Sequence, residues 1–463
     1  MKTVEQKELN EHKKIKESEK TSIREGSFFG VMEGFGVRYI TPYALALGAT
    51  NLIVGLISTL PGFLGNLTQL YTTQLIKKKS RKSLVFFAIL MQALLWIPLI
   101  FVGVLYYFYP AIREYLPWML LTIYSLLIIF GSSAGPAWNS WMKDLIVKNS
   151  GKYFGIRNMI VNMVTIISML IAGFILTFFT NGKVLIGFFI IFFIAFLGRF
   201  ISSLLILKQY EPRFTYDDAS YFTFRQFIKG MLYNNFGRFV FLVSAMSFAT
   251  FLAGPFITVY ILEDLKLTYF QFTIISVSSV LSAILFLPLW GNFADKFGNI
   301  KVIKITSLFI SLIPLLWFFS IYLNMLPFLA FFSFLIFIEL FAGLVWAGFN
   351  LSASMFIYDA VTKQKMMFCI AYFNIINSLG AFFGAVLGGY LSSNYPHFFG
   401  VKAVIILFIA SFILRLLVAL FIQRGVREVR EVKKFKLDEF IKNIEKRFLG
   451  MLSGYKSMRV ENF

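Results

Sequence analysis

Residues 291–301 read Gly291-Asn-Phe-Ala-Asp295-Lys296-Phe-Gly298-Asn-Ile-Lys301, and they join two long apolar stretches, 270–290 and 302–322. Glycine allows helices to approach closely and accepts a positive φ in a turn. An aspartate here can lie near a helix N-terminus, where the macrodipole favours negative charge, and can pair with nearby cations. The segment therefore predicts a tight, charged turn between two apolar helices.

Apolar stretches of this kind recur along the chain. The sequence is 58% hydrophobic and 14% charged, whereas soluble domains carry about 25% charged residues. About 20 apolar residues suffice to cross a bilayer as a helix. Such stretches lie near 27–47, 51–76, 83–108, 118–142, 156–180, 184–207, 239–262, 270–290, 302–322, 328–357, 367–391 and 401–422. We therefore expect an all-α membrane protein with twelve transmembrane helices.

Positive charge is concentrated in alternate connections between these stretches. The connections that follow odd-numbered stretches contain only Arg113, Lys183, Lys266 and Lys402, whereas the others are rich in Lys and Arg. By the positive-inside rule both termini are cytoplasmic. The net charge of +21 is thus assigned to loops and tails, and we expect no nucleic-acid partner.

This topology divides the chain into five segments. We expect a cytoplasmic N-terminal tail at 1–26, six-helix bundles at 27–207 and 239–422, a cytoplasmic linker at 208–238, and a basic cytoplasmic tail at 423–463. The last segment has apolar residues at helical spacing among lysines and arginines, which is typical of an amphipathic helix that binds membrane lipids. A disordered, solubilising tail is the alternative.

Rare polar residues recur at one offset between the two bundles. Asp144 and Asp359 are 215 residues apart, and Asn158 and Asn374 are 216 apart. Arg199 and Arg415 are also 216 apart. The bundles are therefore expected to be parallel repeats.

The turn at 291–301, placed in this repeat, closely resembles the loop signature of the major facilitator superfamily, and the chain looks like a prokaryotic member over residues 27–422. The resemblance implies two six-helix pseudo-repeats and secondary transport of a small solute, with H+ as the expected coupling ion, by alternating access. It also implies a cytoplasmic gate that contains Gly291, Asp295, Lys296, Gly298 and Lys301.

The first half departs from the superfamily pattern. Its corresponding loop, Gln74-Leu-Ile-Lys77-Lys78-Lys79-Ser80-Arg81-Lys82, lacks the acidic residue, and no Asp or Glu occurs between Gly34 and Arg113. Asp144 with Arg157 is a candidate substitute, since residues 136–158 also resemble the helix-four to helix-five region of prokaryotic members.

Three ionisable residues lie within predicted helices, where a charge costs about 2.5–3.5 kcal/mol on insertion scales. They are Glu33, Arg38 and Glu339. On a continuous helix Glu33 and Arg38 would be about 140° apart, which predicts different partners. We interpret Glu33 or Glu339 as the protonatable group and Arg38 as an anion contact or counter-ion, with a structural ion pair as the alternative.

Other polar residues admit two interpretations. In the superfamily, helices one, four, seven and ten line the central cavity, which implies that Trp138 and Asn139 also face the solute or proton. Arg199 and Arg415 are expected to snorkel to the interface. Asn158, Asn162, Asn374 and Asn377 are expected to bridge helices, with lining of the cavity as the alternative. Gly380, Gly384 and Gly388 are expected to form a close-packed helix face.

The sequence does not favour an enzyme. No catalytic constellation falls in the apolar stretches, the only histidines are His12 and His397, and no phosphate-binding loop of the Walker type is found. We therefore expect no metal and no cofactor. The residues are typical of a monomeric transporter of a small solute in the plasma membrane, and a membrane receptor or scaffold of the same fold is the alternative.

Overall fold

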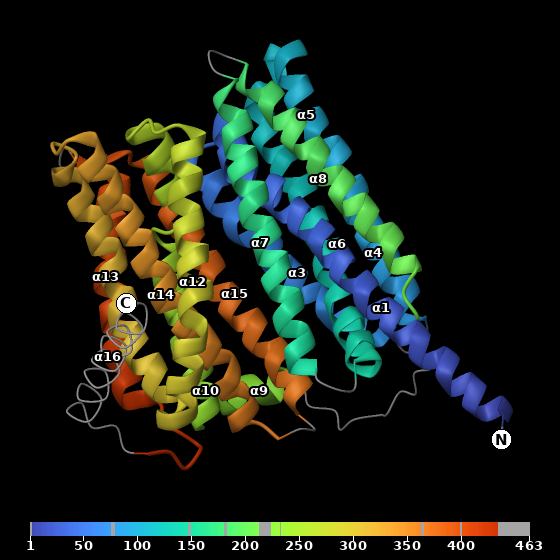
Figure 1. The fold of residues 1–463 in the computed structure, drawn as a ribbon. Coiled ribbons are helices and arrows are strands. Elements are labelled where there is room, and N and C mark those ends of the chain that lie inside the picture. Colours follow the sequence, from blue (N-terminus) through green and yellow to red (C-terminus); the bar gives the residue numbers. More distant parts are fainter. Residues whose placement is uncertain are drawn as a thin grey trace, which may run out of the picture.

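The computed structural model is almost entirely helical (Figure 1) and describes residues 2–75, 79–146, 150–179, 183–212, 224–231, 233–362, 365–398 and 401–433. The first half, called the N half, contains α1 (Lys2–Phe35), η1 (Val37–Tyr39), α2 (Ile40–Ala46), α3 (Asn51–Leu75), α4 (Arg81–Leu94), α5 (Trp96–Phe108), η2 (Pro110–Tyr115), α6 (Leu116–Leu145), α7 (Ser150–Thr177) and α8 (Val184–Leu207). The linker contains α9 (Phe224–Gly230).

The second half, called the C half, has the same helical character. It contains α10 (Asn235–Phe251), α11 (Phe256–Val259), η3 (Tyr260–Asp264), α12 (Tyr269–Phe297), α13 (Asn299–Leu323), α14 (Phe328–Ala360), α15 (Met366–Asn394) and α16 (Ala403–Gly425). The short strands β1 (His397–Phe398) and β2 (Val401–Lys402) pair antiparallel between α15 and α16.

Eleven helical spans of the described chain are long and apolar enough to cross a membrane. The remaining crossing runs through the end of α1, then η1 and α2, where charged residues interrupt the apolar sequence. The predicted all-α membrane fold is therefore confirmed. Some helices are longer than the apolar stretches that predicted them. Helices α1 and α6, for example, extend beyond the apolar stretches 27–47 and 118–142.

Two crossings are broken at small or imino residues. The first changes from α to 3₁₀ geometry after Gly36, whose Cα faces the Trp96 ring so closely that any Cβ would collide with it. The seventh ends α10 at Phe251 and resumes as α11 after Pro255, which lacks the N–H that a continuous helix needs. Both breaks free backbone groups inside the bundle.

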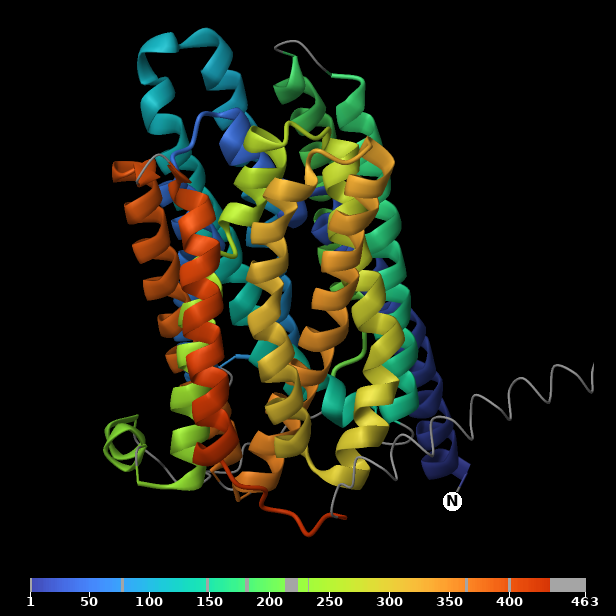
Figure 2. The same ribbon diagram turned by 90° about the vertical axis from the view of Figure 1, so that its left-hand side faces the viewer.

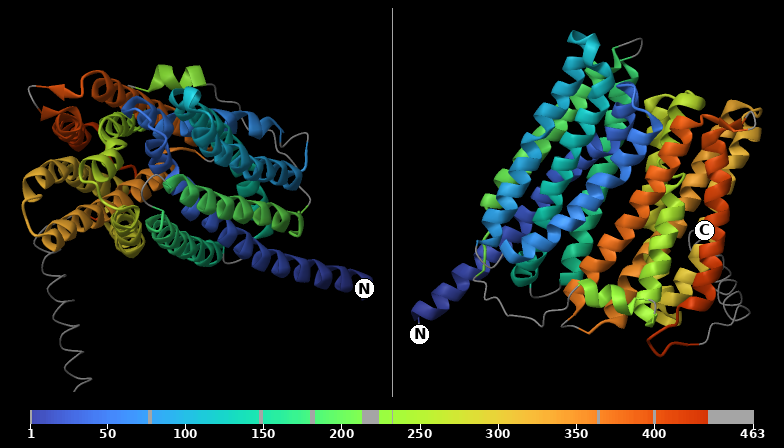
Figure 3. Two further views of the ribbon diagram at one scale, coloured as in Figure 1. Left: turned by 90° about the horizontal axis from the view of Figure 1, so that it is seen from above. Right: turned by 180° about the vertical axis from the view of Figure 1, so that it is seen from behind.

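The two halves lie side by side and are seen from three further directions in Figures 2 and 3. They meet through α3 with α15 and through α7 with α12. We call the end of the bundle with α9 the linker end and the end with β1 and β2 the hairpin end. Charged turns of the sequence, including residues 79–82 and 295–301, lie at the linker end.

Close packing of α15 against α10 confirms the predicted small-residue face. A Cβ on Gly380, Gly384 or Gly388 would collide with the backbone oxygen of Ser244, Phe248 or Leu252, respectively. The three glycines therefore allow direct backbone contact between these helices.

Helix α1 starts far before the bundle and projects from it at the linker end (Figure 3). It passes through the predicted boundary at residue 26 without a break, and Ser18, Ser22 and Glu25 are already buried in the N half. The basic amphipathic helix expected beyond residue 433 lies outside the described residues.

Candidate functional site

Glu33 and Arg38 form an ion pair at the break in the first crossing. The distance from Arg38 Nε to Glu33 Oε1 is 3.4 Å. The expectation that they meet different partners is wrong, because it assumed a continuous α-helix, whereas the chain turns at Gly36 and continues as 3₁₀. The break brings the two side chains together.

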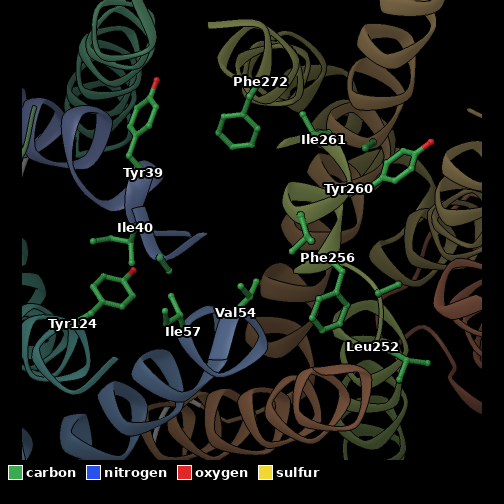
Figure 4. Close-up of a cluster of buried hydrophobic side chains, with 14 of the residues drawn as sticks. Tyr39, Ile40, Val54, Ile57, Tyr124, Leu252, Phe256, Tyr260, Ile261 and Phe272 are labelled. Carbon is green, nitrogen blue, oxygen red and sulfur yellow. The ribbon is translucent and has the colours of Figure 1, made fainter. Parts of the chain in front are cut away.

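This pair is accessible although it lies in the middle of a crossing. The Arg38 side chain is 45% exposed and that of Glu33 is 24% exposed. Both charges act on the hydroxyl of the buried Tyr124 in α6. Figure 4 shows Tyr124 beside Ile40 and opposite residues of the C half such as Phe256. Tyr39, which follows Arg38 in the sequence, contacts Thr273 of the C half.

A third charged residue, Arg199 of α8, lies in the interior of the N half. It is 4% exposed, its guanidinium lies 5.0 Å from the Phe29 ring, and it interacts electrostatically with Glu33. Its Nη1 lies 3.8 Å from Glu25 Oε1. The expected snorkelling of Arg199 is wrong, because buried acceptors, including Gln92 Oε1 at 2.6 Å from Nε, satisfy the charge in place.

Glu25 also binds the next cation, Arg157 of α7. Arg157 Nη2 donates to Glu25 Oε2 at 2.9 Å, and its guanidinium lies 4.5 Å from the Trp138 ring. The predicted pairing of Arg157 with Asp144 is wrong: its partner is Glu25, which precedes the apolar stretch. Trp138 therefore belongs to this cluster near the linker end, with Phe154, and Asn139 is exposed.

Five charges thus alternate in sign through the N half, and we call them the charge chain. In order from the centre of the bundle toward the linker end they are Arg38, Glu33, Arg199, Glu25 and Arg157. The three arginines and two glutamates give it a formal charge of +1. Each inner member lies between two charges of opposite sign, which offsets the cost of its burial.

Glu339 of α14 lies in a different environment in the C half. Its carboxyl group interacts with the side chains of Ser279 in α12 and Trp317 in α13. The buried Trp317 Nε1 makes no hydrogen bond to a described residue, and no described cation pairs with Glu339 within 4.0 Å. Glu339 therefore lies among helices of its own half and takes no part in the Glu33–Arg38 ion pair.

Arg415 of α16 does not snorkel to the interface either, and its partners differ from those of Arg199. It is 2% exposed, and its terminal nitrogens donate to Ile310 O and Thr250 O, each at 3.3 Å. One turn earlier on α16, Ser411 Oγ donates to Ala249 O at 2.6 Å. Arg415 and Ser411 therefore bind carbonyl groups at the end of α10, where the seventh crossing is broken.

The predicted gate residues lie in and beside the turn between α12 and α13 at the linker end of the C half. Gly298 has φ of +91° and ends α12, as its type predicts, and Gly291 lies within α12. Asp295 and Lys296 are exposed, and Asp295 lies before the turn and not at the start of α13. The expected capping by Asp295 is wrong: Glu428 Oε2 accepts from Ile300 N at 2.9 Å.

A second carboxylate completes this turn. Asp359 Oδ2 accepts from Asn299 Nδ2 at 2.7 Å and lies 3.1 Å from Arg430 Nε. Arg430 also donates to Ala294 O. These contacts bind the start of α13 to the end of α14 and to the segment after α16, whereas Lys301, one turn into α13, is partly buried.

The N half contains the same arrangement at its linker end. Glu211 Oε1 accepts from Arg81 N, at the start of α4, at 2.8 Å, and Asp144 Oδ2 accepts from Arg81 Nη1 at 2.5 Å. Asp144 therefore pairs with Arg81. Glu211 and Glu428 are 217 residues apart, so the offset of the repeat could have identified both, although they lie outside the apolar stretches.

The halves contact each other near the hairpin end. Tyr39 Oη lies 2.6 Å from Thr273 Oγ1 of the C half and donates to Met169 O at 2.7 Å. Leu52 N donates to Ser393 Oγ at 2.9 Å. Aromatic and aliphatic side chains of both halves, among them Phe256 and Phe272, flank this region in Figure 4. The arrangement joins α7 to α12 and α3 to α15 at that end.

Among the described contacts, one of the four asparagines joins two helices through its side chain. Asn377 Oδ1 accepts from Ser247 Oγ at 2.6 Å, which joins α15 to α10 as predicted. Asn374 contributes its backbone oxygen to Asn66 Nδ2, at 3.4 Å, across the two halves. Asn158 and Asn162 are exposed on α7.

Comparison with known proteins gives a consistent result. A family model described as Major Facilitator Superfamily matches residues 26–226 and 239–459. Sequence comparison with curated proteins finds no match. Among solved structures, a D-xylose-proton symporter is 13% identical with a TM-score of 0.68, and covers 90% of this chain and 99% of its own.

Two further solved structures share the fold with similar sequence identities and TM-scores. A mutant of the nucleoside transporter NupG is 15% identical with a TM-score of 0.66, covering 88% of this chain and 99% of that one. A bacterial homologue of the iron transporter ferroportin, in an inward-facing state, is 13% identical with a TM-score of 0.62, covering 88% and 98%.

Proposed function

Because the chain belongs to the Major Facilitator Superfamily and is a secondary transporter, not an enzyme, we propose that its small solute binds at the Glu33–Arg38 pair between the two halves. The observation that carries the proposal is the accessibility of this pair in the middle of a crossing. Charge inside a membrane is costly and is retained where it lines a pathway. Trp138, whose ring lies against Arg157, is assigned to the scaffold and not to solute contact.

Contacts between the halves support alternating access around this pair. Tyr39 joins the N half to Thr273 on the hairpin side of Arg38. Gly173 permits that approach, since a Cβ there would collide with Thr273 Oγ1. We therefore propose that the solute reaches the pair from the linker end in this state, and that separation of the hairpin ends admits it from the other side.

Glu339 is the proposed proton-coupling group. It lies within the bundle without a described cationic partner, whereas Glu33 is paired with Arg38. A carboxyl group without a counter-ion can exist protonated inside a bundle at lower cost than as an anion. The D-xylose-proton symporter, which shares the fold, is named for coupling to protons.

The proposed orientation places the linker end in the cytoplasm. Lysines and arginines concentrate in the linker-end connections, which is the distribution that sets cytoplasmic loops. We propose a plasma-membrane protein that acts as a monomer. Membrane-impermeant thiol labelling of intact cells, with single cysteines at Lys143 or Asn324 in a Cys369→Ala background, tests the orientation: Asn324→Cys should react and Lys143→Cys should not.

The solute site is tested by thermal stabilisation of the purified protein across a panel of metabolites and drugs. A stabilising solute should lose its effect in Arg38→Ala and change its affinity in Glu33→Gln, whereas Arg24→Ala, an exposed arginine of α1, should respond as the wild type. Hits that are indifferent to both site changes would contradict the proposed site.

The proton role is tested separately in proteoliposomes that contain the stabilising solute. Glu339→Gln should retain solute exchange, which needs no net proton movement, and lose accumulation driven by a pH gradient. Retention of gradient-driven accumulation would show that Glu339 does not carry the coupled proton.

A further inference from the structure

Arg38 has hydrogen-bonding capacity that the protein does not use. Its described contact with Glu33 is made by Nε at 3.4 Å. Its two terminal nitrogens have no hydrogen-bond partner among the described residues. These two nitrogens form the planar fork that binds carboxylate and phosphate groups in a bidentate manner.

Glu33 is also within the electrostatic reach of a second cation, Arg199, although the two do not form an ion pair within 4.0 Å. Arg199 interacts with Glu33 from the interior of the N half. Arg199 is fixed by Gln92 Oε1 at 2.6 Å and Ser202 Oγ at 3.1 Å, and its ring contact with Phe29 places it on the α1 face between Glu25 and Glu33. A buried cation held in this way competes with Arg38 for the carboxylate of Glu33.

The net positive charge of the charge chain also leaves Arg38 incompletely neutralised. Two glutamates face three arginines, and the pair at the linker end, Glu25–Arg157, is closed by a 2.9 Å contact. The surplus positive charge therefore falls to the end of the chain, where Arg38 is the most exposed member at 45%. No described acidic residue other than Glu33 lies within 4.0 Å of Arg38.

We infer that the solute carries an anionic group, a carboxylate or a phosphate, which binds the terminal nitrogens of Arg38 while Arg199 holds Glu33 from the other side. The inference rests on the transport site proposed above and adds the solute class. It makes Arg199 a positioning residue: Arg199 does not touch the solute but determines how far Glu33 competes with it for Arg38.

The experiment compares matched anionic and neutral compounds in thermal stabilisation of the purified protein. The pairs are benzoate with benzamide, succinate with succinamide, and glucose 6-phosphate with glucose. We expect stabilisation by an anion and not by its neutral partner, and the arm that responds distinguishes carboxylate from phosphate. In Arg38→Gln the affinity should fall about 10- to 100-fold, as expected for lost charge-assisted hydrogen bonds, whereas Arg38→Lys should retain part of it.

The role of Arg199 is tested by rescue. Arg199→Gln should weaken binding of the anion several-fold, because Glu33 then interacts with Arg38 alone. The double variant Arg199→Gln with Glu33→Gln should recover the affinity, and Glu33→Gln alone should bind at least as tightly as the wild type. A purely structural effect of Arg199→Gln would persist in the double variant, and that result would overturn the positioning role.

The outcomes separate this inference from the proposed site. If neutral solutes stabilise the protein and depend on Arg38, the site is correct and the anionic class is wrong. If anions stabilise the protein equally in the wild type and in Arg38→Gln, the site itself is wrong. A panel in which no anion stabilises the wild type would also overturn the anionic class.

Discussion

The N half and the C half place an arginine at corresponding positions, 216 residues apart, but satisfy it by different chemistry. Arg199 lies between two carboxylates of α1 and is part of the charge chain. Arg415 is bound by backbone oxygens of Ile310 and Thr250. The repeat therefore preserves a buried guanidinium while its partners differ.

At their linker ends, in contrast, the two halves use the same kind of contact. Glu211 and Glu428 bind backbone N–H groups at the starts of α4 and α13, and Asp144 and Asp359 contact the first residues of the same helices. The two turns thus use equivalent carboxylates. We conclude that the linker ends are shared scaffold, whereas the asymmetry in charge lies at the solute site proposed above.

The strongest test of this comparison is Glu25→Ala. It leaves two buried arginines, Arg157 and Arg199, without their carboxylate, and breaking a buried pair in this way costs about 3–5 kcal/mol. Thermal unfolding in detergent should show a large loss of stability. Glu17→Ala, at an exposed position of the same helix, is the control and should have little effect. Equal shifts for both variants would mean that the charge chain does not stabilise the N half.

Arg415→Met should cost less than Glu25→Ala. It leaves Ile310 O without a donor, since the residue one turn later is Pro314, which costs about 1–3 kcal/mol, and it strands no carboxylate in the described part of the C half. The same unfolding measurement applies, with Arg424→Met near the end of α16 as the control. A loss as large as that of Glu25→Ala would indicate that Arg415 has an ionic partner, and the contrast between the halves would then fail.

Glu211→Ala and Glu428→Ala should each reduce stability by about 1–2 kcal/mol, because each removes a charged cap from a helix N-terminus. Since the two caps are equivalent, their effects should be similar and additive in the double variant. Glu431→Ala, exposed on the segment after α16, is the control. A large effect in only one half would show that the two linker ends are not equivalent.

The sequence predicted the scaffold better than the site. Long apolar stretches and alternating charge are sufficient for the number and type of helices, and the offset between Asp144 and Asp359 revealed the repeat. The Glu33–Arg38 contact could not be predicted, because it depends on the helix break that packing of Gly36 against Trp96 produces. Glu25 was missed because it lies before the apolar stretch, yet the helix carries it into the bundle.

The smallest expected effect concerns the contact between the halves. Thr273→Val removes the hydroxyl next to Tyr39 Oη and should weaken closure of the hairpin end by about 0.5–1 kcal/mol, which shifts the population of open states only a few-fold. Distances between spin labels at Glu114 and Asn324, in a Cys369→Ala background, should gain a longer component. Thr306→Val is the matched control, since its buried hydroxyl bonds only within α13. An unchanged distance distribution in Thr273→Val would mean that apolar packing of α7 on α12, and not this hydroxyl pair, holds the halves together.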